Sequence, residues 1–342
     1  MIAEQNRMFC SRFLRREAPA EWEVTMKDQL LAKFGELFGG TDGAKVYFAP
    51  GRVNLIGEHT DYNGGHVFPC ALTIGTYGVA RRREDKKLRF YSMNFEQLGV
   101  IESSVEGLKP EKEADWTNYP KGVMWAFGEK GMEVTNGMDL LLFGNIPNGS
   151  GLSSSASVEV LTGYILRDQY GFEVSNQDLA LIGQFSENKF NGVNCGIMDQ
   201  FASAMGKKDH AILLDCSTLA YEYVPLKLGD YCIVVANCNK PHNLVESKYN
   251  VRRHEVEVAL KKIQEVKPIK ALAELSVEEF NEVKYLLSGV VEKRAEHVVT
   301  ECARVTEAVA ALKRGDLAEL GRLLNESHYS LRDLYEVTGK EL

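Results

Sequence analysis

Residues 49–65 read APGRVNLIGEHTDYNGG, an apolar stretch that runs into a tight group of polar side chains. Its first half has the composition of β-structure interrupted by a Pro-Gly pair. Glu58, His59 and Asp61 follow at once, and carboxylates of this kind suit a ligand that carries many hydroxyls. Arg52 lies in the strand itself, where a cation needs a charged partner. The alternative is a solvated turn with a surface arginine, which His59 alone does not exclude.

Residues 147–157 read PNGSGLSSSAS and stand between a predicted buried strand and a predicted helix. Gly149 and Gly151 allow the backbone to turn tightly and to approach a ligand. The serines that follow present hydroxyls and N–H groups at a helix N-terminus, where the helix dipole favours a phosphate. The stretch has neither the G-K-[ST] of a Walker loop nor the G-x-G-x-x-G of a dinucleotide site. A glycine turn with a serine cap is the alternative without function.

Two carboxylates that point inward form a third feature. Glu187 continues the helical stripe of Leu179 and Gly183, so we expect it on the packed face. Asp199 follows an apolar pair in the stretch NCGIMDQ at 194–200. A carboxylate in such a place costs free energy unless a metal ion or a cation meets it. A salt bridge at Glu187 and a helix cap at Asp199 are the structural alternatives.

Composition excludes some classes of function. Of the 342 residues, 44% are hydrophobic and 26% charged, as in an ordinary soluble enzyme. The 48 acidic residues outnumber the 40 basic ones, and no basic stripe is present, which argues against nucleic acid and membranes as partners. The seven cysteines are widely spaced and form no C-x-x-C pair, which is typical of reduced thiols. No stretch is long and apolar enough to span a bilayer, so we expect a cytoplasmic protein.

The hydrophobic pattern predicts an α+β chain with two domains. Helices are expected at 23–38, at 118–130, from the stretch 147–157 (the serine loop) to about 170, at 176–191 with Ser175 as cap, and over most of the chain after 246. Strands are expected at 45–56, 66–82, 87–93, 138–143, 211–215 and 231–236. Composition shifts between 219 and 229, which places the domains at 1–220 and 221–342.

The three stretches together resemble the galactokinases, a branch of the GHMP small-molecule kinase family. GRVNLIGEHTDYNGG is similar to the galactokinase signature nearly letter for letter, and GLSSSAS resembles the GHMP phosphate loop. NCGIMDQF is similar to the segment that carries the family's catalytic aspartate. The resemblance continues through KYNVRRHE, RAEHVVTE and NESHYSLRDLYEV, and it covers roughly residues 20–342. It implies the two-domain GHMP kinase fold, with the active site in the cleft between the domains.

By this resemblance, the chain transfers a phosphoryl group from ATP to the anomeric hydroxyl of galactose. Asp199 is the implied base, and Arg52 holds it ionised and stabilises charge on the transferring group. Mg²⁺ is implied between Ser155, Glu187 and the β- and γ-phosphates. The implied sugar contacts are Glu58, His59, Asp61 and Tyr249. The implied nucleotide contacts are Ser92, Gly149, Ser150, Gly151, Leu152, Ser153, Ser154 and Ser155.

Galactose and ATP are thus the expected partners, and we expect a monomer. Two other functions stay open: a GHMP kinase for another sugar, such as N-acetylgalactosamine or arabinose, and a galactose- and ATP-binding sensor without turnover. Such a sensor would be expected to lose part of the serine loop, Arg52 or Asp199, and all of these are present. An inert structural protein has no use for the inward-facing Glu187 and Asp199.

One departure from the family pattern concerns the end of the chain. Galactokinases carry a third, glycine-rich motif near the C-terminus. This sequence ends in YEVTGKEL at 335–342, and no late G-x-G segment is present. We therefore expect a C-terminally truncated galactokinase that is poorly soluble or weakly active at this length.

Overall fold

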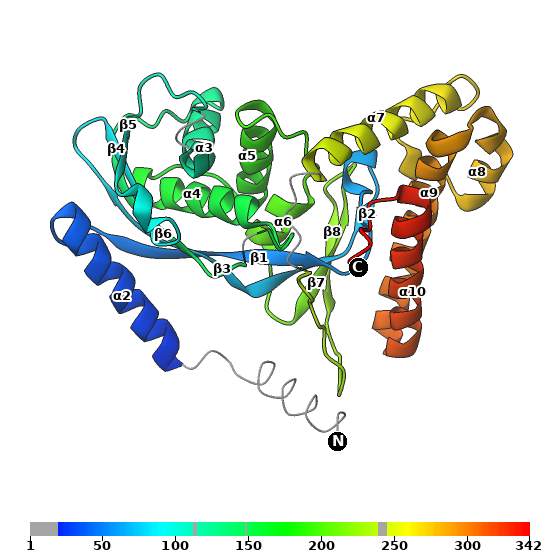
Figure 1. The fold of residues 1–342 in the computed structure, drawn as a ribbon, viewed down its shortest axis with the longest axis horizontal. Coiled ribbons are helices and arrows are strands. Elements are labelled where there is room, and N and C mark those ends of the chain that lie inside the picture. Colours follow the sequence, from blue (N-terminus) through cyan, green and yellow to red (C-terminus); the bar gives the residue numbers. More distant parts are fainter. Residues whose placement is uncertain (1–19, 112–114, 148, 239–244) are drawn as a thin grey trace.

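The computed structural model describes residues 20–111, 115–147, 149–238 and 245–342 (Figure 1). Its strands form a five-stranded sheet of order β1-β3-β6-β4-β5 and a three-stranded sheet of order β2-β7-β8. Neighbouring strands run antiparallel except for β4 and β6. The strands are β1 Lys45–Asn54, β2 His66–Val67, β3 Pro69–Arg82, β4 Lys87–Ser92, β5 Ile101–Ser104, β6 Met138–Gly144, β7 His210–Asp215 and β8 Tyr221–Pro225.

Helices fill most of the remaining chain. The α-helices are α2 Ala20–Phe38, α3 Asn118–Glu129, α4 Ser154–Tyr170, α5 Asn176–Lys189, α6 Met198–Met205, α7 Val245–Gln264, α8 Val277–Val283, α9 Gly289–Arg314 and α10 Leu317–Ser330. Short 3₁₀ turns lie at Asp61–Asn63, Glu96–Leu98, Asp115–Thr117, Leu272–Glu274 and Lys284–Leu286. A single π-helical turn, Leu331–Tyr335, follows α10 directly.

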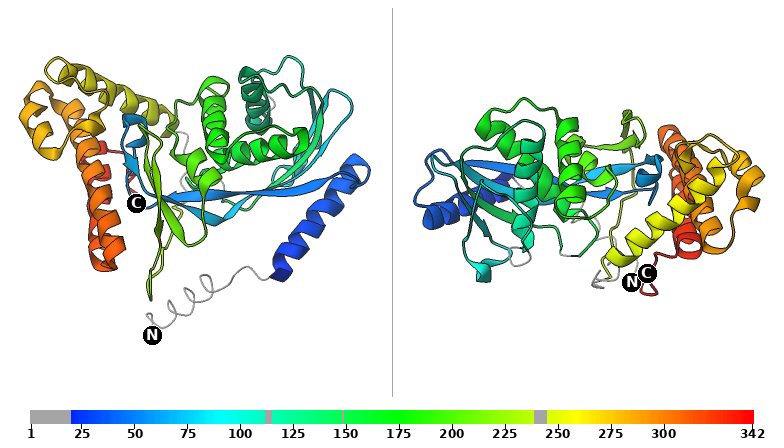
Figure 2. Two further views of the ribbon diagram at one scale, coloured as in Figure 1. Left: turned by 180° about the vertical axis from the view of Figure 1, so that it is seen from behind. Right: turned by 90° about the horizontal axis from the view of Figure 1, so that it is seen from above.

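The five-stranded sheet is covered on both faces (Figure 1; Figure 2). Helices α3 to α6 lie over one face and α2 lies along the other. Side chains alternate along β6: Leu141 packs with Phe34 of α2, whereas Leu140 and Leu142 belong to the core that contains Leu161 of α4. Burial on both faces explains why this strand is a continuous apolar run.

The later part of the chain is built around the long helix α9. Val298 packs with α7 and α8 in one core cluster, and Val305 packs against the three-stranded sheet in another. Strands β7 and β8 pair with each other across residue 220, where the sequence places a domain boundary. The division into 1–220 and 221–342 stays a prediction, and residues 1–19 of the first unit lie outside the described residues.

Most predicted elements are confirmed within a few residues, and so is the mixture of helices and strands. Ser175 caps α5 as expected, because its Oγ accepts from Asp178 N while the Asp178 carboxylate accepts from Ser175 N. No described helix combines the length and the apolar character that crossing a bilayer requires.

The strand predicted at 231–236 is wrong. Residues 231–238 have no regular structure, and Tyr231 and Val234 are 66% and 77% exposed. The composition is rich in β-branched residues, but a strand also needs a neighbour to accept and donate its backbone hydrogen bonds. Among the described residues, no strand pairs with this segment.

Candidate active site

The centre of the site is an ion pair between Arg52 of β1 and Asp199 of α6. Arg52 Nε and Nη2 both lie 2.8 Å from Asp199 Oδ1. Asp199 lies in the first turn of α6, where the helix dipole favours a carboxylate. Burial opposes the charge on Arg52, but Asp199 and the nearby Glu58 and Asp61 carboxylates raise the Arg52 pKa above its ordinary value. Asp199 is therefore the charged partner that an arginine in a strand requires.

The loop between β6 and α4 closes onto this pair. Ser153 Oγ donates a hydrogen bond of 2.6 Å to Asp199 Oδ2. Arg52 donates from Nη1 to the carbonyl of Gly151 at 2.7 Å and from its backbone N to the carbonyl of Leu152 at 3.3 Å. Both charged side chains are thus tied to the serine loop.

The backbone of this loop has the form of an anion site. φ is +66° at Gly149, +71° at Gly151 and +59° at Ser153, while Ser150 and Leu152 between them stay at negative φ. Such alternation turns successive N–H groups toward one side, as in the nests that bind phosphate. Ser153 precedes α4 without a side-chain cap bond, because its hydroxyl serves Asp199 instead. The first N–H groups of α4 are therefore left for solvent or ligand.

A buried acidic group lies behind the loop, between α4 and α5. Glu187 is 5% exposed and Glu159 is 1% exposed. Burial, with Glu187 beside it, raises the pKa of Glu159 well above its ordinary value. Gln200 Nε2 donates to Glu159 at 2.9 Å, and the Gln200 Oε1 atom is buried without a hydrogen-bond partner among the described residues. Two adjacent buried carboxylates with a spare amide oxygen are the oxygen donors that a hard divalent cation prefers.

Glu159 was missed by the sequence analysis. It lies four residues after Ser155 on α4, so both project from one face of that helix. That spacing was the available signal, but only the packing of α4 against α5 brings Glu159 to Glu187. The described part of the chain contains no group of three or more acidic, histidine or cysteine side chains placed to hold a metal ion. A cation site formed by Ser155 and Glu187 therefore stays a prediction.

The polar loop after β1 brings Asp61 and Glu58 to the same region. Asp61 packs against Gly196, where an added Cβ would lie 1.9 Å from Asp61 Oδ2. A residue with a side chain therefore cannot replace this glycine without moving the carboxylate. Burial and the charge of Asp199 raise the pKa of Asp61 to about 6, and burial raises that of Glu58 to about 7.

His59 and Tyr249 complete this loop. His59 has a left-handed backbone with φ of +62°, and its Nδ1 lies 3.0 Å from the Tyr62 hydroxyl. Burial lowers the pKa of His59 to about 3, so the ring is neutral. The Tyr249 ring, on α7, lies 5.8 Å from His59 and 5.2 Å from Tyr62. The four residues proposed for sugar contact thus come from one loop and from α7.

Ser92 lies at the base of the serine loop. It is 6% exposed at the end of β4, and its Oγ accepts from Asn94 N at 3.2 Å. Asn94 in turn exchanges two hydrogen bonds, of 2.7 and 2.8 Å, with Gly144, the last residue of β6. Ser92 therefore neighbours the strand end from which the loop departs, and its hydrogen bonding runs to Asn94 rather than to Arg52 or Asp199.

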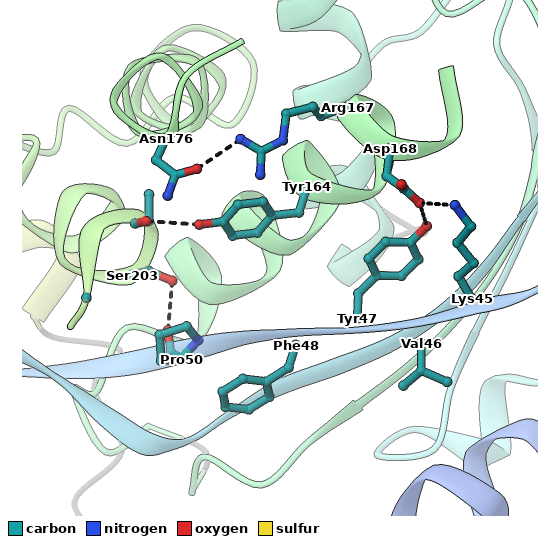
Figure 3. A pocket seen from close by; sticks show the side chains of 12 residues that line it. Lys45, Val46, Tyr47, Phe48, Pro50, Tyr164, Arg167, Asp168, Asn176 and Ser203 are labelled. Carbon is teal, nitrogen blue, oxygen red and sulfur yellow. Dashed lines mark hydrogen bonds and ion pairs between the residues drawn. The ribbon is translucent and has the colours of Figure 1, made fainter. Parts of the chain in front are cut away.

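A separate hollow of about 700 Å³ lies between β1 and helices α4, α5 and α6 (Figure 3). Asp168 accepts from Lys45 Nζ at 2.8 Å and from the Tyr47 hydroxyl at 2.5 Å. Arg167 donates to Asn176 Oδ1 at 2.9 Å. These polar groups bond to one another, and none of the predicted site residues lines this hollow.

Comparison with known proteins places this site in a family. The model of the galactokinase galactose-binding signature matches residues 32–82, and that of the GHMP kinases N-terminal domain matches residues 118–207. A curated galactokinase from Clostridium beijerinckii is 56% identical over 314 residues, which is 92% of this chain and 80% of that protein. The chain belongs to the galactokinase family.

Solved structures agree with this assignment. The crystal structure of Lactococcus lactis galactokinase complexed with galactose superposes with a TM-score of 0.91 at 49% identity, covering 93% of this chain and 82% of that one. Mevalonate kinase from Methanococcus jannaschii superposes with a TM-score of 0.55 at 14% identity, covering 87% and 81% of the two chains. The second similarity concerns the fold alone, and the predicted GHMP kinase fold is confirmed.

Proposed function

We propose that this galactokinase family member transfers the γ-phosphoryl group of ATP to the anomeric hydroxyl of galactose, giving galactose 1-phosphate and ADP. The observation that carries the proposal is the pair of Arg52 and Asp199, joined by Ser153 to the anion-binding loop. The residues of the galactose signature, Glu58 and Asp61, surround the same pair. A base, a cation, a phosphate cradle and a hydroxyl-binding loop therefore meet at one place.

In the proposed reaction, Asp199 accepts the proton of the anomeric hydroxyl. Arg52 keeps Asp199 in place and adds positive charge beside the transferring group. Phosphoryl transfer requires positioning and charge neutralisation more than covalent catalysis, and these residues supply both. The N–H groups between Gly149 and Ser155 hold the triphosphate. Glu58, His59, Asp61 and Tyr249 orient the sugar through its hydroxyls, which carboxylates and a neutral imidazole bind well.

We further propose that Mg²⁺ binds with ATP, and that Ser155 and Glu187 are its protein ligands. The support is the buried pair of Glu187 and Glu159: burial beside Glu187 raises the pKa of Glu159, and a bound cation would favour the charged carboxylates instead. When bound, the ion neutralises negative charge on the phosphates. Ser92 is proposed as a nucleotide contact from its place beside the loop. The cytoplasmic location and the monomeric state stay predictions.

The test is ADP release by the purified chain with ATP, Mg²⁺ and a panel of galactose, N-acetylgalactosamine and arabinose. We expect galactose-dependent release, with the sugar 1-phosphate identified by ³¹P NMR. Galactose binding without ADP release would favour the sensor, and a preference for another sugar of the panel would reassign the substrate. Asp199→Asn serves as the control for contaminating kinases.

A further inference from the structure

Tyr335, near the C-terminal end of the chain, contacts the loop after β1 that carries Glu58, His59 and Asp61, here called the sugar loop. It is the last residue of the π-helical turn Leu331–Tyr335, and its side chain is fully buried. Its hydroxyl lies 2.7 Å from the hydroxyl of Tyr62, which in turn lies 3.0 Å from His59 Nδ1. Its ring lies 4.7 Å from the ring of His59. Figure 1 shows this C-terminal segment, drawn in red, beside β2 and the loop that precedes it.

The backbone at this contact is unusual on both sides. A π-helical turn is rare and is frequently found at functional sites. Glu336, which caps the turn, has a φ of +55°, and His59, which lies against Tyr335, has a φ of +62°. A left-handed backbone is strained in a residue other than glycine, because Cβ comes close to the following carbonyl oxygen. Such conformations persist only where the surrounding structure fixes them.

Two buried arginines fix the turn. Arg252 of α7 donates from Nε to the Tyr335 carbonyl at 2.6 Å. Arg294 of α9, 1% exposed, donates to the Leu334 carbonyl and pairs with Glu336 at 2.7 Å. Glu255 pairs with both guanidinium groups, at 3.0 Å from Arg252 and 2.9 Å from Arg294, and so offsets the cost of burying them. A phenylalanine at 335 would fill the same volume. What the tyrosine adds is therefore its hydroxyl, which contacts the hydroxyl of Tyr62.

A second contact supports the neighbouring residue of the loop. His297 of α9 lies with Nε2 3.0 Å from the Glu58 carbonyl and Nδ1 2.8 Å from Ser330 Oγ. Because a carbonyl can only accept, Nε2 carries the proton and Nδ1 accepts from the serine hydroxyl. The ring of His297 also lies 4.5 Å from that of Tyr335. Glu58 and His59 are therefore both held by the C-terminal helices.

We propose that Tyr335 is a positioning residue for galactose binding, which sets the orientation of His59 through the hydroxyl of Tyr62. This inference rests on the proposed function, in which His59 contacts the sugar. Engagement of Nδ1 by Tyr62 leaves Nε2 as the nitrogen of His59 that meets a sugar hydroxyl. Tyr335 is fully buried, so it acts through His59 and not by contact with the sugar or the phosphates. Its effect therefore falls on sugar affinity and leaves the chemical step unchanged.

The test is Tyr335→Phe, which removes one oxygen and keeps the ring. Loss of one hydrogen bond predicts a rise of about three- to tenfold in the KM for galactose, with kcat and the KM for ATP within about twofold of wild type. Galactose affinity measured by calorimetry should fall by the same factor. Tyr329→Phe is the matched control, because Tyr329 lies nearby but is 51% exposed, and its values should not change.

A double-mutant cycle separates positioning from general loss of structure. Tyr62→Phe breaks the same chain of hydroxyls, so Tyr62→Phe with Tyr335→Phe should be no worse than Tyr62→Phe alone. An unchanged galactose KM in Tyr335→Phe, an equal rise for galactose and ATP, or simple additivity in the cycle would each overturn the inference while the proposed function stands. A wild-type chain that does not bind galactose would overturn both. Should Tyr335→Phe fail to fold, Tyr62→Phe alone must still raise the galactose KM selectively, or the inference is wrong.

Discussion

Replacing Asp199 with asparagine removes the charge of the proposed base and keeps its shape. Oδ1 of Asp199 faces two nitrogens of Arg52, and Oδ2 faces the hydroxyl of Ser153. The amide oxygen of asparagine can stay toward Arg52. Its NH₂ group then faces Ser153, whose hydroxyl can turn from donor to acceptor. The variant therefore keeps a hydrogen-bonded side chain at this position and loses the proton acceptor.

The size of the effect follows from two losses. A general base contributes about 10²–10⁴-fold, so we expect kcat to fall about 10³-fold, or about 4 kcal/mol of transition-state stabilisation. Stability should fall by about 1–3 kcal/mol, because Arg52 loses its counter-charge. That is less than a fully buried pair costs, since Asp199 is 32% exposed and water screens the remaining charge.

The assay is coupled ADP release at saturating galactose and Mg-ATP, with urea denaturation and galactose calorimetry on the same samples. Asp168→Asn is the matched control: Asp168 is also paired with a cation, Lys45, but lies at the separate hollow. Its kcat should stay within about twofold of wild type. A kcat for Asp199→Asn within about threefold of wild type would refute the assignment of Asp199 as the base.

Three further predictions concern the surroundings of this pair. Gly196→Ala should raise the galactose KM at least about tenfold, because its Cβ would lie 1.9 Å from a sugar-loop carboxylate, whereas Gly128→Ala meets open space and should change nothing. Glu187→Gln should raise the Mg²⁺ concentration needed for half-maximal activity at fixed ATP, while the exposed Glu173→Gln should not; equal titrations would make Glu187 structural. Because the pKa of Glu58 is raised to about 7 in the folded chain, its stabilising protonation is present at low pH and lost as pH rises through 7. In urea titrations, the free energy of unfolding of Glu58→Gln minus that of wild type should therefore increase by up to about 3 kcal/mol from about pH 5 to pH 8. If this difference did not change with pH, the raised pKa of Glu58 would be contradicted.

The sequence predicted the elements well where local pattern decides them. The run at 138–143 and the cap at Ser175 need only their own neighbours along the chain. The strand predicted at 231–236 failed because strand formation depends on a partner that local composition does not contain.

The same distinction applies to the site. Arg52 could be singled out because a cation inside a strand is costly, although its partner 147 residues away came from resemblance alone. Tyr335 carries no local mark of function, and Glu159 has only its spacing of four residues from Ser155. Glu159 matters through its packing against Glu187, and Tyr335 through a contact with Tyr62 across 273 residues. Such contacts follow from the fold, which neither periodicity nor composition encodes directly.

The charges of the site explain how an acidic protein can bind a polyanion. Within it, Arg52 faces the carboxylates of Glu58, Asp61 and Asp199, and the buried Glu187 lies beside a further carboxylate. One guanidinium cannot offset these charges together with those of a triphosphate. The backbone N–H groups of the serine loop supply further positive potential, and the proposed Mg²⁺ would supply the rest. Burial raises the pKa values of Glu58, Asp61 and Glu159, so in the proposed reaction a cation beside these carboxyl groups would favour nucleotide and metal bound together over either one alone.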